Sequence, residues 1–269
     1  MDAFPRGTAG SLGILRFCVF LLAFFYVART PLSDLALLPR DLQGSILLLQ
    51  RLPEFIQAPL LTPFALEILR WVLLSLLALC ALGIRPWRPF ALPTLALLLV
   101  FDALVKGFAG YINHYQVGLI SMVAVLALFP SADSAALIRW CRKRPASGEV
   151  HVAAHITMAL ILILPYLLIG IRRLVYGGLQ IHLNDTIVFD VAEQSLTPAR
   201  WSFRLGLLVL DHSWIHPVLK GGFLLITLLE ILSPLVLICR PFRHFWLLSM
   251  LAFHLSTLLL MNIFFWENA

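Results

Sequence analysis

Charge is scarce in this chain of 269 residues, because only 13% of them are Asp, Glu, Lys or Arg, whereas about 25% is usual in a soluble domain. Lysine is the scarcest cation, with 3 Lys beside 17 Arg. Hydrophobic residues make up 61% of the chain, and the mean hydropathy is +0.92. A soluble protein of this composition would lack the polar side chains needed to cover its surface. The shortage of charge therefore excludes an ordinary soluble domain and indicates an integral membrane protein.

Several functional signatures are also missing. The chain has no basic tract with interleaved aromatic residues, so its net charge of +6 suits anionic lipid head groups and predicts no binding to nucleic acid. It has no nucleophile elbow, no glycine-rich phosphate loop and no pair of neighbouring cysteines. His212 and His216 have the spacing of two ligands on one helical face, but Pro217 follows and HExxH is absent. We therefore expect no metal site.

Long apolar runs are what the chain does have. A helix needs about 20 predominantly apolar residues to cross a bilayer. Residues 1–269 therefore predict a single domain, an all-α polytopic membrane helix bundle of about seven transmembrane helices with interfacial segments. The seven segments are Ser11–Ala28, Pro63–Ile84, Phe90–Gly107, Ile112–Pro130, Val152–Ile171, Val218–Cys239 and Phe245–Phe265.

Two longer connections, Arg29–Thr62 and Arg172–Pro217, mix apolar residues with charges, Pro and Gly. The first contains SILLLQRLPEFIQAPLL, which is too interrupted to span and indicates an interfacial or re-entrant segment. The second contains WSFRLGLLVL, which is too short to span, so we expect it to lie on the membrane surface.

The arginines of the short loops predict the orientation of the chain. With a cytoplasmic N-terminus, the inner side of the membrane holds most of the short-loop cations, and Cys18, Cys80, Cys141 and Cys239 fall in or near the reducing side. We expect a protein of the cytoplasmic (inner) membrane with the N-terminus inside and the C-terminus outside. The inner cations are Arg6, Arg85, Arg88, Arg139, Arg142, Lys143, Arg144, Arg240 and Arg243.

Ionisable residues at membrane depth are costly and are therefore candidates for function. Glu67 and Arg70 have i, i+3 spacing, and Asp102 and Lys106 have i, i+4 spacing, so pairing within each helix is the simplest interpretation. Glu230 and His254 have no such partner in their own helices. They either satisfy each other or Arg16 across the bundle, or they take part in binding a ligand or moving a proton.

A second polar set is expected at the outer mouth of the bundle. YINHYQ places Asn113 and His114 at the outer end of the fourth predicted helix, and PYLLIGIRRLVYGG places Arg172 and Arg173 at the outer end of the fifth. The alternative for the arginine pair is ordinary snorkelling toward lipid head groups.

The order of several segments resembles the HTTM (horizontally transferred transmembrane) domain family, the membrane part of vitamin K-dependent gamma-carboxylase and its bacterial relatives. The resemblance covers most of the chain, and it lies in the order and spacing of short segments. These are ILRFCVFLLAFFY, LLPRDL, INHYQVGLISMVAVLALFP, YLLIGIRRLVYGG and FHLSTLLLMNIFF.

The resemblance implies a site for a quinone or hydroquinone cofactor on the outer face. It places Arg172 and Arg173 where the carboxylases have a lysine pair that acts as base, and it places Asn113 and His114 at the family's Asn-His. Arginine stays protonated and is a poor base, although it can bind and polarise an anion. The chain also stops at Ala269, without the large lumenal domain of the carboxylases, so we expect no carboxylation of glutamate.

Three functions are left open, and the sequence does not decide whether the chain is an enzyme. The first is a membrane protein that binds a quinone, another isoprenoid or a lipid head through His114, Arg172 and Arg173, either as a binding protein or as a carboxylase-related oxidoreductase in which these three are the catalytic residues. Asn113, Asp102, Lys106, Glu230, His254 and Arg16 are the further ligand-binding candidates. The second is a non-catalytic subunit that supports a membrane-protein partner or the maturation of an exported peptide. The third is a transporter, which is the weakest because no inverted repeat is visible.

Overall fold

The structure is a computed structural model that describes residues 7–37, 55, 61–85, 87–109, 116–131, 138–139, 148–196 and 203–263. The regular secondary structure of these residues is helical apart from one parallel pairing of two-residue strands, β1 (Ile84–Arg85) with β2 (Ile138–Arg139). The predicted all-α fold class is confirmed for this part of the chain. The chain, for which the sequence predicts a single domain, has two compact units, Arg6–Met158 and Ala159–Ala269.

Among the residues that the structure describes, five helical stretches are long and apolar enough to cross a membrane. They fall on the first, second, third, fifth and seventh of the predicted segments. Their bounds are Ala9–Asp34, Pro63–Leu82, Arg88–Lys106, Gly148–Gly177 and Arg240–Met261.

The other two predicted segments are shorter as helices. Within the fourth segment the structure describes α6 (Val117–Leu128), which has 12 residues. The sequence predicts one helix over the sixth segment, but the structure has α11 (Ile215–Ile231) followed by a turn and the short α12 (Leu235–Ile238). Pro234 explains the break, because proline has no amide hydrogen and its ring clashes with the preceding helical turn.

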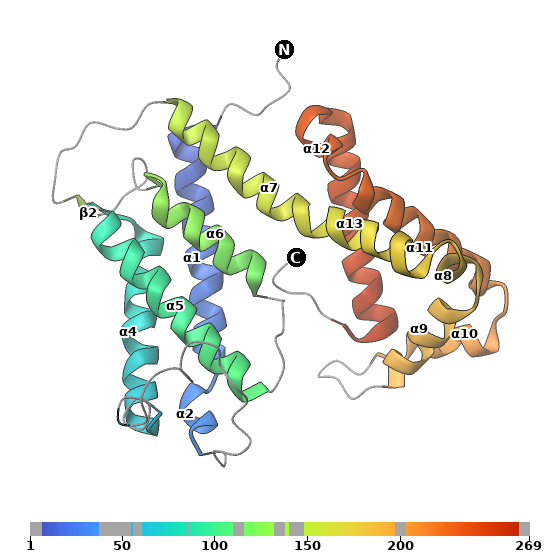
Figure 1. Cartoon of the computed structure of the whole chain (residues 1–269), viewed down its shortest axis with the longest axis horizontal. Helices are drawn as coiled ribbons and strands as arrows, with labels where there is room; N and C mark the ends of the chain where they lie inside the picture. Colours follow the sequence, from blue (N-terminus) through green and yellow to red (C-terminus); the bar gives the residue numbers. More distant parts are fainter. Residues whose placement is uncertain are drawn as a thin grey trace. The chain divides into compact units, whose positions relative to one another are not determined.

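The N-terminal unit is a bundle of antiparallel helices (Figure 1). It comprises α1 (Ala9–Arg29), α2 (Leu32–Leu35), α4 (Pro63–Leu82), α5 (Arg88–Ala109), α6 and the first part of α7 (Gly148–Arg172). α4 packs between α1 and α5, and α6 packs on both α1 and α5. The β1–β2 pairing joins the segment after α4 to the segment after α6, so the two lie at one end of the bundle.

Side-chain caps define where these helices begin and end. Thr8 and Ser11 form a reciprocal capping box at the start of α1. Thr62 accepts a hydrogen bond from the amide of Ala65 at the start of α4, where Pro63 occupies the first turn. Gly83 ends α4 with φ of 79°, a left-handed conformation that glycine adopts without strain.

In its described residues, the C-terminal unit contains the second part of α7, the helices α11 and α12, and six further helices. They are η3 (Arg173–Gly177, a π-helical turn), α8 (Gln180–Leu183), α9 (Thr186–Leu196), η4 (Leu205–Leu207), α10 (Leu208–Asp211) and α13 (Arg240–Met261). One core cluster forms around Trp246, Leu229 and Ile163. The other core cluster forms where Val188 and Val191 of α9 pack near Val209 of α10. Asn262 joins α13 to α9 and the segment after it, because its side chain donates to Ser195 O at 3.2 Å and accepts from the Phe203 amide at 2.7 Å.

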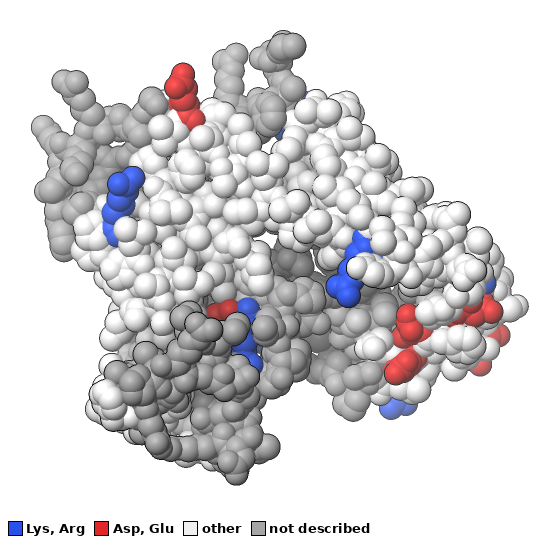
Figure 2. All heavy atoms as spheres, viewed as in Figure 1, with Lys and Arg blue, Asp and Glu red and all other residues white. Residues whose placement is uncertain are grey.

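Large apolar side chains lie on the outside of both units. Trp71 is 60% exposed in the N-terminal unit and Leu248 is 68% exposed in the C-terminal unit. Figure 2 shows the corresponding scarcity of charge, with Lys, Arg, Asp and Glu in a few small groups on a mostly uncharged face. Exposed apolar surface of this extent suits contact with lipid or with another apolar surface.

Candidate functional site

The candidate site of the C-terminal unit begins with one face of α7. Ile163, Tyr166, Gly170 and Arg173 follow each other at intervals of three, four and three residues, so they share a helical face. A Cβ added to Gly170 would lie 2.9 Å from Glu230 Cβ. The missing side chain at Gly170 therefore allows α11 to approach α7 closely and brings Glu230 to the end of α7.

Arg173 and Glu230 form an ion pair across this contact. Arg173 Nη1 donates to Glu230 Oε2 at 2.7 Å, and the Glu230 side chain is only 2% exposed. The Arg173 guanidinium also lies 4.9 Å from the ring centroid of Phe223, which precedes Glu230 by about two turns on the same face of α11. A buried carboxylate without a cation would be strongly unfavourable, so Arg173 is the group that permits Glu230 at this depth.

A second polar contact lies about two helical turns earlier, on α7. The Tyr166 hydroxyl and His254 Nε2 are hydrogen bonded at 2.9 Å, which ties α7 to α13. Trp246 packs edge-to-face on Tyr166 at 5.1 Å between ring centroids. The two ligand candidates Glu230 and His254 therefore have separate partners, Arg173 at the start of η3 and Tyr166 on α7.

His182 on α8 is buried, with 2% of its surface exposed, and its ring lies 4.8 Å from the Phe223 ring. Neither ring nitrogen has a hydrogen-bond partner among the described residues. Burial, and then the positive charge of Arg173, lower the pKa of His182. A buried imidazole without a partner is unfavourable by about 1–3 kcal/mol, so this side chain needs an explanation.

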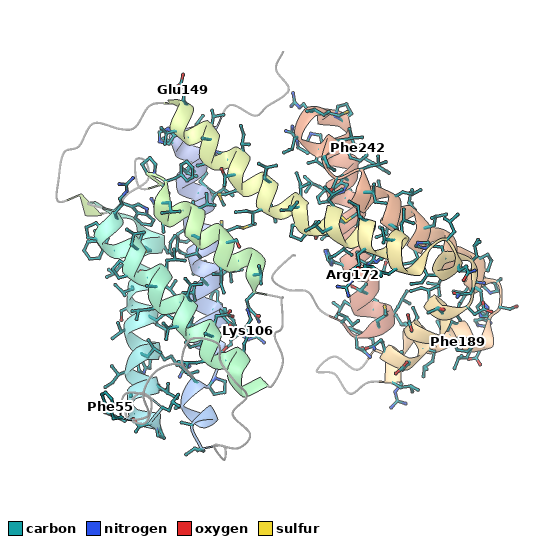
Figure 3. All side chains as sticks on the ribbon, in the orientation of Figure 1. Phe55, Lys106, Glu149, Arg172, Phe189 and Phe242 are labelled. Atoms are coloured by element: carbon teal, nitrogen blue, oxygen red, sulfur yellow. The ribbon has the colours of Figure 1, made fainter. Side chains whose placement is uncertain are left out.

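Arg172, the other member of the predicted pair, has a different environment. It is exposed at the end of α7 (Figure 3), and its guanidinium lies 5.9 Å from the ring centroid of Tyr176. Tyr176 is 84% exposed. An exposed arginine stacked on an exposed tyrosine at the end of an apolar helix is the arrangement expected where a helix meets lipid head groups. The pair thus has one half-buried member, Arg173, and one exposed member, Arg172.

In the N-terminal unit, Asp102 is the centre of a small buried network. Lys106 Nζ lies 2.5 Å from Asp102 Oδ2, which confirms the predicted pairing along α5. The Tyr26 hydroxyl donates to Asp102 Oδ1 at 3.1 Å. Both carboxylate oxygens are thereby used, and the network fixes α1 against α5.

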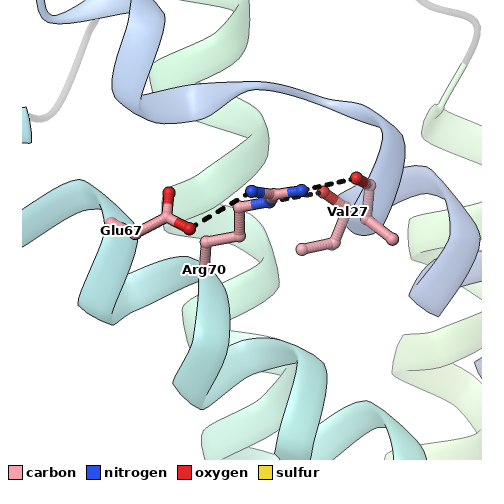
Figure 4. A network of polar contacts seen from close by, with 4 residues as sticks. Val27, Glu67 and Arg70 are labelled. Carbon is pink, nitrogen blue, oxygen red and sulfur yellow. Dashed lines mark hydrogen bonds and ion pairs between the residues drawn. The ribbon is translucent and has the colours of Figure 1, made fainter.

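Glu67 and Arg70 also form the predicted pair, at 3.3 Å. Arg70 reaches further, because it donates to Val27 O at 3.4 Å and to Ala28 O at 2.6 Å. Figure 4 shows this arrangement, with the guanidinium between the carboxylate of Glu67 and the carbonyls at the end of α1. Arg70 therefore caps α1 from a neighbouring helix.

Arg16 is 1% exposed within the N-terminal unit. It donates to Ser131 O at 3.0 Å and to Ala81 O at 3.4 Å. A Cβ added to Gly83 would lie 2.7 Å from the guanidinium, so the glycine that ends α4 also makes room for Arg16. These contacts join α1 to the ends of α4 and α6, so the role of Arg16 is structural. The sequence predicts Arg16 or His254 as the partner of Glu230, whereas in the structure that partner is Arg173.

The predicted site residues lie in two separate units of the chain. Asn113 and His114 lie outside the described residues. Asp102, Lys106 and Arg16 belong to the N-terminal unit, and Arg172, Arg173, Glu230 and His254 belong to the C-terminal unit. The structure brings together Arg173 with Glu230 and Asp102 with Lys106.

Tyr166 and Phe223 were not among the predicted site residues, and His182 was expected only as one of several polar residues in the loop at the outer mouth of the bundle. Tyr166 precedes Arg173 by seven residues and Phe223 precedes Glu230 by seven residues, so each pair shares a helical face. That spacing is a signal that sequence reasoning could have used. The meeting of the two faces depends on the register of α7 against α11, which neither helix encodes alone.

His216, one of the two histidines considered above for a metal, has other contacts. Its Nε2 lies 2.8 Å from Val209 O, and its Nδ1 lies 4.0 Å from Asp185 Oδ1. In the part of the chain that the structure describes, no group of three or more His, Cys, Asp and Glu side chains could hold a metal ion. In comparisons with protein-family models, curated proteins and solved structures, this chain has no match.

Proposed function

We propose that this chain is a polytopic integral membrane protein that binds the polar head of a quinone, another isoprenoid or a lipid at the Arg172–Arg173 end of α7. One observation carries the proposal. Arg173 stands at the end of an apolar stretch long enough to cross a membrane, Gly148–Gly177, where it is held by Glu230 and covers the ring of Phe223. Cationic hydrogen-bond donors beside an aromatic ring, at the end of a membrane-length helix, suit a ligand that has an oxygen-bearing head group and an apolar tail.

The proposed topology has seven crossings in the inner membrane, with the N-terminus in the cytoplasm and the C-terminus outside. The five long apolar stretches support five of the crossings, and α6 and α11 with α12 would provide the other two. The pairing of β1 with β2 supports the alternation, because it brings the backbones of Arg85 and Arg139 to one end of the N-terminal unit. Both arginines belong to loops that we assign to the cytoplasm.

The proposed roles differ between the two arginines. Arg172 is exposed and would attract the head, while Arg173 would bind and polarise one of its oxygens. Neither would act as a base, because a guanidinium stays protonated in proteins. We therefore propose that the two arginines bind the head group, and we do not propose the glutamate carboxylation of the HTTM-like carboxylases. Asn113 and His114 stay predicted contacts of the same ligand.

A second candidate is a non-catalytic subunit that supports a membrane-protein partner or the maturation of an exported peptide. The observation that favours it is the saturation of the buried charges. Glu230 is satisfied by Arg173, and Asp102 by Lys106 and Tyr26. Such pairing is also what a purely structural role requires. A transporter stays the weakest alternative.

Extraction of bound lipids distinguishes these candidates. The full chain purified in mild detergent is expected to carry a quinone, isoprenoid or lipid that Arg173→Ala loses, whereas the matched control Arg204→Ala, which changes an exposed arginine elsewhere in the same unit, keeps it. Unchanged extraction from Arg173→Ala would contradict the proposal. Copurification of a stoichiometric protein partner that survives both substitutions would favour the supporting subunit.

A further inference from the structure

His182 is the one buried side chain of the candidate site whose polar atoms have no partner within the described residues. Its ring packs on Phe223, and Arg173 packs on the same ring. A neutral imidazole carries one donor and one acceptor, and a protonated imidazole carries two donors. An imidazole held in this position therefore offers hydrogen bonds that the protein itself does not use.

Arg173 has hydrogen-bonding capacity left as well. Glu230 engages only its Nη1, and a guanidinium has five N–H donors in a planar fork. The Arg173 side chain is 23% exposed, whereas the Glu230 side chain is 2% exposed. The carboxylate thus holds one edge of the guanidinium from the buried side, and the remaining donors stay available to a ligand.

We propose that Arg173 and His182, which both pack on Phe223, form a binding site for a phosphate group. The inference rests on the proposed function and deepens it, because it names the chemistry of the head. A phosphate has several oxygens, so it can accept from Arg173 and His182 at once, and a planar guanidinium fork matches phosphate geometry. Glu230 already supplies a carboxylate to Arg173, and the unused donors are those a second, multidentate anion would need.

Access to the site requires α8 to move, because the ring nitrogens of His182 are covered. α8 has only four residues and is joined to η3 through Gly177 and Gly178. Gly178 has φ of 57°, which an L-residue rarely adopts. A π-helical turn that begins at Arg173 leads into this glycine pair, and such turns are frequent at functional sites. α8 is therefore a short cover on a glycine hinge.

A phosphate beside His182 would favour the protonated ring, so binding is expected to take up a proton. Arg173 on η3 is the charge that acts on His182. The other charged or titratable groups on the elements packed against α8 fall into two sets. In the first, Lys220 and His216 lie near Asp185, and Glu230 pairs with Arg173. The second set is exposed and consists of Tyr176, Asp190 and Glu193. Because a phosphate itself titrates with a pKa of about 6, the part of the pH dependence that substitution of His182 removes is the part that reports on His182.

The test is binding of phosphatidic acid to the full chain in detergent, measured by native mass spectrometry. Diacylglycerol, which lacks the phosphate, and inorganic phosphate, which lacks the tails, are run alongside. Phosphatidic acid or inorganic phosphate should bind, with affinity rising as the pH falls from about 8 to 6 across the ordinary range of a histidine. Competition by inorganic phosphate at equal affinity identifies a free phosphate as the source, and its failure to compete identifies a lipid head group.

Two variants of His182 make the test specific. His182→Phe keeps an aromatic ring against Phe223 and removes both nitrogens, so phosphate affinity should fall about tenfold, the equivalent of one charged hydrogen bond. His182→Gln keeps a donor that does not titrate, so it should retain binding and lose the share of the pH dependence that His182 contributes. His212→Phe, the same substitution at an exposed histidine of this unit, should change neither. Equal phosphate binding by the wild type, His182→Phe and His182→Gln at every pH would overturn the inference.

The two proposals fail in different ways. If Arg173→Ala loses its extracted quinone or isoprenoid while the His182 variants leave phosphate binding unchanged, the head-binding function stands and the phosphate assignment is wrong. If neither class of ligand responds to either residue, both proposals are wrong.

Discussion

Glu230 on α11 lies directly against Gly170 on α7, so closely that a Cβ on residue 170 would be 2.9 Å from Glu230 Cβ and 3.1 Å from the Ile231 amide nitrogen. This approach brings the carboxylate within reach of Arg173 one turn later. The geometry of the candidate site thus depends on a residue that carries no side chain. It also makes the site sensitive to small changes at the helix contact.

Gly170→Ala should destabilise the C-terminal unit. Its methyl group meets Glu230 Cβ and the Ile231 backbone, and overpacking of this kind costs about 1–3 kcal/mol. The matched control is Gly221→Ala on α11, where a Cβ would meet nothing within 4 Å and the gain in helix propensity is about 0.5–1 kcal/mol. Thermal unfolding in detergent measures both. Equal melting temperatures for the two variants would show that the close approach does not limit stability.

Arg173→Met should be more damaging than the double substitution Arg173→Met with Glu230→Met. The single change leaves a carboxylate buried without its cation, which costs about 3 kcal/mol, whereas replacement of both partners by apolar groups is often tolerated. A double-mutant cycle on unfolding free energies measures the coupling. Additive losses from Arg173→Met and Glu230→Met would mean that the pair is not coupled.

Arg16→Met should loosen the N-terminal unit, because it removes the donors to Ser131 O and Ala81 O. Buried hydrogen bonds from a charged group contribute about 1.5–3 kcal/mol each. Arg29→Met, at an exposed arginine of the same helix, should have little effect. Limited proteolysis of purified protein compares the two, and equal cleavage rates would argue against a structural role for Arg16.

Acid should destabilise the C-terminal unit through His182. Burial and Arg173 lower its pKa below the unfolded value of 6.5, so the unfolded chain binds the proton more readily. The stability that neutral His182 contributes is fully present above pH 6.5, and it is lost as the pH falls from there through the folded-state pKa. Melting temperatures at pH 7.5 and 5.5 should therefore differ more for the wild type than for His182→Phe. An identical pH dependence of the two would contradict this account.

Much of the fold follows from local patterns in the sequence. Apolar runs predict the long helices, and spacing along one helix predicts the pairs Glu67–Arg70 and Asp102–Lys106, because both partners lie on neighbouring turns. The partner of Glu230 could not be predicted in the same way. It depends on the register of α7 against α11, which the small residue Gly170 and the core around Trp246 determine together.

The break in the sixth predicted segment could not be predicted from hydropathy either. An apolar composition continues through Val218–Cys239, so hydropathy alone indicates one span. Pro234 interrupts the hydrogen bonding of the helix locally, and α11 ends at Ile231. Composition therefore predicts where the chain prefers an apolar environment better than it predicts where each helix ends.

The central claim is that the chain crosses the membrane with the Arg172–Arg173 end of α7 outside. Thr186→Cys places a thiol at an exposed position that follows this end, and an impermeant thiol reagent applied to intact cells measures its side of the membrane. Native Cys141 and Cys239, assigned to the inside, are the internal controls. The account predicts that the variant labels in intact cells well above the wild type, which reacts only after permeabilisation. Labelling of the introduced cysteine only after permeabilisation would contradict it.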